Sequence, residues 1–184
     1  LDTLEFWETE LFSTLTMEVD CYTFMALVNA QPETSIQLLT MSDGSDDAGA
    51  MTFGWIISLP TGQRLARCAG PAYGPYGSSF RAEGYGFLSV SRFLVRIQEF
   101  CQQQPTWRIQ MMTDNQGLLT RVETSLPFVD PFPNCTLQAD WDVTNEIVTS
   151  IRQLNTIPTL LHVKGHQDDG ADYGALPLDA QLNV

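Results

Sequence analysis

The stretch LLTMSDGSDD, residues 38–47, is mostly apolar in its first half and acidic in its second. It opens as an apolar strand and ends with three acids within five residues, the first of them Asp43. A second stretch, QMMTDNQG at 110–117, repeats the pattern and places Asp114 after an apolar run. Two neighbouring strands that each end in an acid bring their carboxylates together, and carboxylates are ligands of hard divalent cations. The two stretches therefore predict a metal site at Asp43 and Asp114.

The residues on either side of Asp43 have the pattern of a sheet. IQLLTM at 36–41 is short and apolar, as expected of a covered central strand. AMTFGWIISL at 50–59 alternates between large apolar and small or polar residues, which predicts one buried face. The turn PTGQ then leads into RLARCAG at 64–70. We expect three strands with at least one hairpin.

A long helix is expected after the Gly/Pro-rich loop, from Ser79 to about Gln103. Apolar residues at spacings of three and four give it a buried stripe. The stripe consists of Phe87, Val90, Leu94, Ile97 and Cys101. Glu83 lies four residues before the first of them, so it falls on the same inward face. An acid on an apolar face is costly unless it is paired or bound to metal, so Glu83 joins the candidate site.

The remaining pattern completes a mixed α/β fold. Strands are expected at WRIQMMT (107–113) and TLLHV (159–163), with helices at NQGLLTRVE (115–123) and ADWDVTNEIVTSIRQL (139–154) between them. The order βββαβαβ predicts a five-stranded mixed sheet flanked by helices. Residues 1–34 have a rough helical period and precede a break at Pro32, so we expect a helical arm there.

Composition limits the function classes. The chain has 184 residues, 43% of them hydrophobic, and a net charge of −13 with nine basic residues, of which only Lys164 is a lysine. This balance argues against strong unaided binding of nucleic acid, because such binding relies on neutralised phosphates. It suits a metal site, an acidic solubilising surface, or a domain that borrows basic surface from a neighbour.

Membrane and secreted classes are disfavoured. No apolar run reaches the roughly 18 residues that span a bilayer, and the acidic N-terminus does not have the pattern of a secretory signal. The four cysteines form no CxxC pair. We therefore expect the cysteines to be reduced thiols and the protein to be intracellular, in the cytoplasm or nucleus.

Each acid also has an ordinary explanation. Asp43 precedes Gly44 and can form a turn, while Asp114 can cap the helix that follows it. Glu83 can favour the first turn of its helix through the dipole, although the capping-box position before it is Phe80. These alternatives stay open for single residues, whereas convergence of all three favours metal.

The two histidines do not form a zinc site. His162 and His166 are spaced HxxxH, but the segment has a strand pattern, in which four residues span about 13 Å. We expect His162 to be structural, near the strand end, and His166 to lie in a polar loop where it can act on a ligand.

Four blocks of the sequence together resemble the ribonuclease H family. They are SDGS (42–45), SSFRAEGYGFLSV (78–90), MTDNQGLL (112–119) and HVKGH (162–166), in the family's order. Within this family, the four blocks most resemble ribonuclease H domains of retrotransposon polyproteins, where the domain follows a reverse transcriptase. The resemblance covers residues 35–184, and residues 1–34 would join this domain to a preceding polymerase or connection region.

The resemblance implies a ribonuclease H-like fold and a metal-dependent endonuclease that cuts the RNA strand of RNA–DNA hybrids. It assigns Asp43, Glu83 and Asp114 as ligands of two Mg²⁺ or Mn²⁺ ions, and His166 as a mobile catalytic histidine. Two such ions can activate a water and stabilise the leaving oxygen. Ser45, Asn115 and Gln116 lie beside the acids in the sequence and are candidates for contacts to the hybrid's minor groove.

Two features depart from the family. Its fourth carboxylate, at the start of the last helix, has no match, since position 176 is Leu. Asp168, Asp169 and Asp172 lie in the loop, Asp179 is the nearest candidate, and we expect the true residue beyond Val184, with the domain truncated at its last helix. The family's basic protrusion is also missing, because residues 118–156 carry only two arginines.

Two other functions remain open. A catalytically silent ribonuclease H-like scaffold or binding domain of a polyprotein need not bind metal. A metal-dependent phosphatase on another α/β fold would hydrolyse small phosphate esters.

Overall fold

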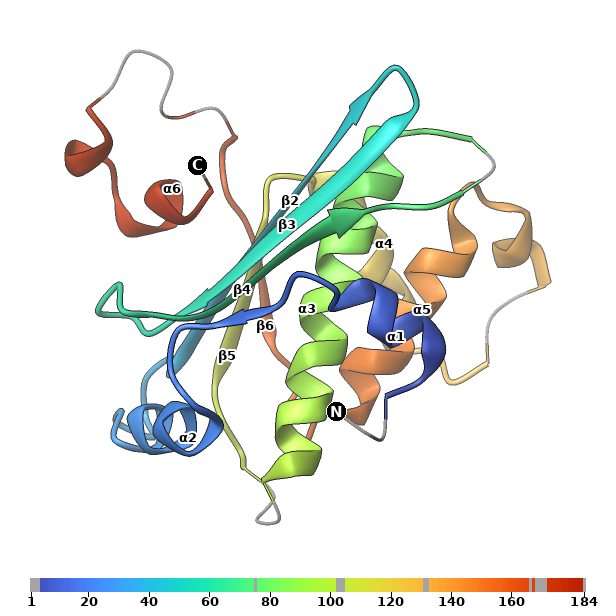
Figure 1. The fold of residues 1–184 in the computed structure, drawn as a ribbon. Coiled ribbons are helices and arrows are strands. Elements are labelled where there is room, and N and C mark those ends of the chain that lie inside the picture. Colours follow the sequence, from blue (N-terminus) through green and yellow to red (C-terminus); the bar gives the residue numbers. More distant parts are fainter. Residues whose placement is uncertain are drawn as a thin grey trace.

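A computed structural model describes residues 4–74, 76–101, 105–130, 133–165, 167 and 172–183 (Figure 1). Six strands and six α-helices are assigned in this part of the chain. The strands are β1 (Thr16–Met17), β2 (Leu38–Asp47), β3 (Ala50–Ser58), β4 (Arg64–Pro71), β5 (Ile109–Thr113) and β6 (Thr159–His162). The helices are α1 (Phe6–Leu11), α2 (Cys21–Asn29), α3 (Ser79–Phe100), α4 (Gln116–Ser125), α5 (Trp141–Gln153) and α6 (Leu178–Leu182). Short 3₁₀ turns cover Pro133–Leu137 and Tyr173–Ala175.

The strands form one mixed sheet in the order β1-β4-β3-β2-β5-β6. The pairs β1–β4, β4–β3 and β3–β2 are antiparallel. The pairs β2–β5 and β5–β6 are parallel. The predicted βββαβαβ order is confirmed, with two helices, α4 and α5, in the last connection. The sheet has six strands where five were expected, because β1 from the N-terminal segment pairs with the edge of β4.

The stretch 38–47 is strand along its whole length, which corrects the prediction that the strand ends near Asp43. Its acidic half pairs with β3, from Asp43 opposite Gly54 to Asp47 opposite Ala50. The turn lies instead at Ala48 and Gly49, with φ of 52° and 89°. Two positive φ values suit a tight two-residue hairpin, whose twist matches the paired strands. The polar half of β2 is therefore strand because it has a partner, although its composition resembles a loop.

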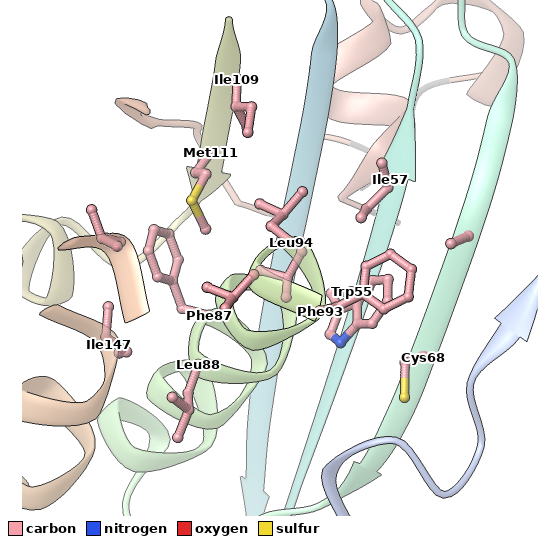
Figure 2. Close-up of a cluster of buried hydrophobic side chains, with 14 of the residues drawn as sticks. Trp55, Ile57, Cys68, Phe87, Leu88, Phe93, Leu94, Ile109, Met111 and Ile147 are labelled. Carbon is pink, nitrogen blue, oxygen red and sulfur yellow. The ribbon is translucent and has the colours of Figure 1, made fainter. Parts of the chain in front are cut away.

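Helix α3 packs across one face of the sheet and carries most of the core (Figure 2). The predicted stripe is confirmed, since all five of its residues are buried. Figure 2 shows Phe87, Phe93 and Leu94 of α3 directed toward Trp55 and Ile57 of β3 and Met111 of β5. The helix ends at Phe100, earlier than predicted, with Cys101 as its C-cap.

The other face of the sheet is covered only in part. Helices α3, α4 and α5 lie on one side and α6 on the other (Figure 1). There a small second cluster joins Met41, Met112 and Val163 to Leu182 of α6. This leaves β3 and β4 with an open face beside Asp43.

The N-terminal segment packs onto this domain. It contains helices, as predicted, and also strand β1. Glu8 of α1 is fully buried and accepts hydrogen bonds from Arg92 and Arg96 of α3. The role of residues 1–34 as a link from a preceding domain stays a prediction. Among the described residues, no helix is long and apolar enough to cross a membrane.

Candidate metal centre

Asp43 and Asp114 meet because two parallel strands stop pairing at the same level. The β2–β5 ladder ends with Ser42 opposite Thr113. Asp43 is the next residue of β2, and Asp114 is the first residue after β5. The expectation that the two acids converge is confirmed, although only β5 ends there.

Glu83 reaches the same point from α3 because the helix lies very close to β2. A Cβ added to Gly44 would lie 2.2 Å from the backbone C of Ala82 and the backbone N of Glu83. A Cβ added to Gly86 would lie 3.1 Å from the backbone oxygen of Asp43. Residues with side chains at these two positions would push the helix outward. The two glycines therefore set the distance between Glu83 and Asp43.

One carboxylate oxygen from each of Asp43, Glu83 and Asp114 lies within 4.8 Å of the other two. Asp43 is exposed, Asp114 is half-buried and Glu83 is buried, so the cluster is closed on the side of Glu83 and open to solvent on the side of Asp43. Within the described parts of the chain, none of the three pairs with an arginine, lysine or histidine side chain. Oxygens at this spacing fit a shared hard cation, whose ligands lie roughly 2.0–2.6 Å from the ion.

The environment of Glu83 shows how much the cluster needs positive charge. Burial first, and then the charges of Asp43 and Asp114, raise the pKa of Glu83 to about 9. The hydroxyl of Thr113 donates a hydrogen bond of 3.1 Å to Glu83 Oε2. Burial and the two neighbouring charges therefore favour the protonated form of Glu83 when no metal is bound, and a divalent cation would favour the charged form.

Backbone groups and close packing fix the two aspartates. The N–H of Gly44 donates to Asp43 Oδ1 at 2.7 Å. The Nε2 of His162 lies 3.0 Å from the carbonyl oxygen of Asp114, which agrees with the structural role expected for this histidine. A Cβ added to Gly165 would lie 2.3 Å from Asp114 Oδ2. The Asp114 carboxylate thus occupies space that only a glycine leaves free.

The ordinary explanations for the three acids are wrong. Asp43 lies within a paired strand, not in a turn. The N-cap of α4 is Asn115, whose Oδ1 accepts from the N–H of Leu118 at 2.9 Å. Glu83 is the fifth residue of α3, beyond its first turn, and the cap of that helix is Ser78.

The predicted substrate residues border the cluster, and their role stays a prediction. The Ser45 hydroxyl lies 3.0 Å from that of Thr52 on the hairpin. Asn115 uses its oxygen as a helix cap, which leaves its amide hydrogens as donors. Gln116 donates to the Thr120 hydroxyl at 3.4 Å. His166, predicted as catalytic, lies outside the described residues.

The candidates for a fourth carboxylate do not join the cluster where the structure describes them. Asp172 accepts from the N–H of Gly174, and Asp179 accepts from the N–H of Ala180. Neither belongs to the group of three, which was found among the described residues. Asp168 and Asp169 lie outside them.

Gly44, Thr113 and Gly165 also belong to the site, although the sequence pattern did not single them out. Each directly precedes or follows a residue that the four blocks highlight, and Gly165 stands within HVKGH. Their roles depend on strand register and helix approach, which a one-dimensional pattern does not give.

No protein-family model and no curated protein matches the chain. Solved structures do. LC11 RNase H1 in complex with RNA/DNA hybrid is 14% identical, with a TM-score of 0.48, covering 73% of this chain and 88% of that one. RNase H1 from the archaeon Halobacterium salinarum is 18% identical, with a TM-score of 0.46 and coverages of 73% and 91%. The prototype foamy virus protease–reverse transcriptase is 16% identical, with a TM-score of 0.48 and coverages of 78% and 19%.

The first two of these are ribonucleases H, the family that the four sequence blocks resemble.

Proposed function

We propose that this domain is a metal-dependent endonuclease that hydrolyses the RNA strand of RNA–DNA hybrids. The observation that carries the proposal is the convergence of Asp43, Glu83 and Asp114 from three separate elements to within 4.8 Å, without a described cationic side chain to balance them. A cluster that only stabilised the fold would be balanced internally, because like charges at this distance repel.

The three side chains fit divalent metal and would hold it in distinct ways. Bound Mg²⁺ or Mn²⁺ ions would activate a water and stabilise the leaving oxygen of a phosphodiester. Asp43, the exposed member, faces the incoming phosphate. Glu83 would hold an ion from a buried position, oriented by Thr113, and would release its proton on doing so. Asp114 is fixed in place by Gly165 and by the end of β6.

The hybrid and the polyprotein context belong to the same proposal. Ser45, Asn115 and Gln116 border the cluster at positions from which they can contact the minor groove of a bound duplex. A reverse transcriptase or connection domain in the same polyprotein would supply the basic surface that this chain lacks.

The test is single-turnover cleavage of an end-labelled RNA–DNA hybrid in Mg²⁺, Mn²⁺ or EDTA. Wild type should cleave only with metal, and Asp114→Asn should lose cleavage by orders of magnitude. Asp114→Asn should melt, without metal, at the same or a higher temperature, because it relieves repulsion. The matched control is Asp47→Asn, which removes the same charge from the end of β2, outside the cluster.

Cleavage by Asp114→Asn at the rate of Asp47→Asn would reject the catalytic role. Absence of metal-dependent cleavage in the wild type, with metal still bound, would favour the silent binding domain. Hydrolysis of small phosphate esters without cleavage of the hybrid would favour a phosphatase.

A further inference from the structure

Most basic side chains of this acidic protein contact other groups of the domain. Six of the nine are arginines that bind carboxylates, backbone carbonyls or a ring within the domain on the α-helical side or at the ends of the sheet strands. Arg81 pairs with Asp140 and Asp142, and both Arg92 and Arg96 bind Glu8. Arg108 donates to the Thr34 carbonyl and Arg152 to the Leu126 carbonyl. Arg121 donates to the Ala139 carbonyl and lies over the Phe80 ring. The other three basic residues are Arg64, Arg67 and Lys164.

Arg64 and Arg67 share one groove with a residue of the metal centre. The groove has a volume of about 650 Å³ and crosses the face of the sheet opposite α3, from Asp43 on β2 to both arginines on β4. The register places Asp43, Gly54 and Ala69 in one row across three strands, and Arg67 lies two residues further along β4. Ideal sheet spacings put the Cα atoms of Arg67 and Asp43 about 12 Å apart, roughly three nucleotides of a stacked strand.

The lining of the groove suits a sugar–phosphate backbone. Hydroxyl groups of Thr16, Ser45 and Thr52 line it together with the two arginines. Its aromatic residues, Phe53 and Trp55, are buried toward α3, so bases have no exposed ring on which to stack. Guanidinium forks and hydroxyls are donors that match phosphate oxygens.

Neither arginine is locked in its present contact. Arg67 pairs with Glu18 at 3.1 Å, and both side chains are largely exposed, at 60% and 38%. Arg64 donates to the Tyr173 hydroxyl at 3.1 Å on the surface. Exposed pairs of this kind contribute little stability, so a phosphate can displace them.

We propose that the backbone of one nucleic-acid strand leaves the metal centre along this groove, with successive phosphates bound by Arg67 and Arg64. The inference rests on the proposed function, because it takes the phosphodiester at Asp43 as its starting point. It makes the open face of β3 and β4 a substrate surface, and it gives an acidic chain a local cationic path.

The test measures binding of a fluorescent RNA–DNA hybrid to the whole chain, with Ca²⁺ in place of Mg²⁺, across a range of salt concentrations. The double variant Arg64→Gln/Arg67→Gln should bind at least about tenfold more weakly. Its slope of log K against log salt should fall by about two, one for each lost phosphate contact. Glu18→Gln should bind more tightly than wild type, since it releases Arg67.

Arg108→Gln is the matched control. Arg108 is exposed, the substitution removes one positive charge, and the residue lies just before β5, at the end of that strand away from Asp114. The proposal that this groove binds nucleic acid would be rejected if the double variant had the same affinity and salt slope as Arg108→Gln. It would also be rejected if the wild type showed no salt-dependent binding. Melting temperatures within a few degrees of wild type would exclude misfolding.

Failure of the groove and failure of the nuclease proposal give different results. Binding that depends on Arg64 and Arg67, without cleavage in Mg²⁺, would reject the nuclease and keep the groove. Cleavage by the wild type, with unchanged binding by the double variant, would reject the groove and keep the nuclease.

Discussion

Glu83 has the surroundings that most strongly disfavour a charged side chain. It is buried beside two other carboxylates, and its raised pKa means that the metal-free fold prefers it protonated. A carboxylate held in this way binds a cation with release of a proton. The affinity for metal should therefore rise with pH.

Glu83 should make the metal-free protein less stable as the pH rises. Its folded pKa of about 9 lies above the ordinary value of 4.5, so its favourable contribution is complete below about pH 4.5 and is lost as the pH approaches 9. The melting temperature without metal should fall between pH 6 and 9, and saturating Mg²⁺ should reduce or reverse the fall. Glu83→Gln should flatten the metal-free profile, and a slope equal to that of wild type would contradict this account of Glu83.

Gly165→Ala should damage the metal centre without unfolding the protein. The new Cβ would lie 2.3 Å from Asp114 Oδ2, and the carboxylate can rotate away at little cost to the fold. Affinity for Mn²⁺, measured by calorimetry, should fall about 10–100-fold, as is typical of residues that orient metal ligands. Gly174→Ala, where a Cβ meets its nearest neighbour at 3.8 Å, is the control. Equal affinities in the two variants would show that Gly165 does not position Asp114.

At this scale the sequence predicted the charged residues and missed the residues that hold them. Asp43, Glu83 and Asp114 are visible because acids after apolar runs, or on an apolar stripe, break a simple pattern. Thr113 and Gly165 break no pattern. Thr113 matters because α3 brings Glu83 next to it, and Gly165 matters because β6 pairs beside β5; only the folded chain defines these contacts.

At the scale of elements, the approach of α3 to β2 determines whether the site exists. Gly44 lies against the backbone of Ala82 and Glu83, which cannot move without moving the helix. The apolar stripe of α3 could be predicted from its period, but this distance could not. The extension of β2 to Asp47 was missed for a similar reason, since pairing with β3 overrides a loop-like composition.

Gly44→Ala should therefore destabilise the fold and separate Glu83 from Asp43. Inserting a methyl group into such a contact costs about 1–3 kcal/mol or more in the free energy of unfolding. Gly54→Ala is a matched control, because it lies opposite Asp43 on β3 and its Cβ would meet nothing closer than 3.9 Å. Chemical denaturation compares the two, and equal unfolding free energies would contradict the close contact.

Helix α1 is held by one buried acid. Glu8 is fully buried and accepts from Arg92 Nε at 2.8 Å and from Arg96 Nε at 3.1 Å. Burial raises the pKa of Glu8, but the hydrogen bonds from Arg96, the Glu5 backbone and Arg92 outweigh it and hold the pKa below its ordinary value. This contact could not be predicted from the sequence, because an acid in a short helix usually lies on the solvent-exposed side.

Glu8→Gln should thus cost about 3–5 kcal/mol of unfolding free energy, because two guanidinium groups lose their charged partner. The exposed pair of Glu18 and Arg67 provides the comparison, and Glu18→Gln should change stability by less than about 1 kcal/mol. Denaturant titration of both variants measures the difference. A similar, small cost for both would mean that α1 is only loosely attached.

For the whole molecule, the fold class was accessible from the sequence and the function class only in part. Hydrophobic periods and turns predicted the order βββαβαβ. The two-residue strand β1 was missed because it is too short to show a period. The charge of −13 pointed away from nucleic acid. The structure qualifies that number, since three of the acids gather in one cluster and Arg64 and Arg67 line a groove together with Asp43.

The central claim is that Asp43, Glu83 and Asp114 hold divalent cations. Anomalous diffraction from crystals soaked in Mn²⁺ tests it most directly. We expect at least one strong anomalous peak within about 2.0–2.6 Å of oxygens from all three side chains, and its loss in Glu83→Gln crystals soaked in the same way. Saturating Mn²⁺ that leaves no peak between these carboxylates, or an equal peak in Glu83→Gln, would contradict the account.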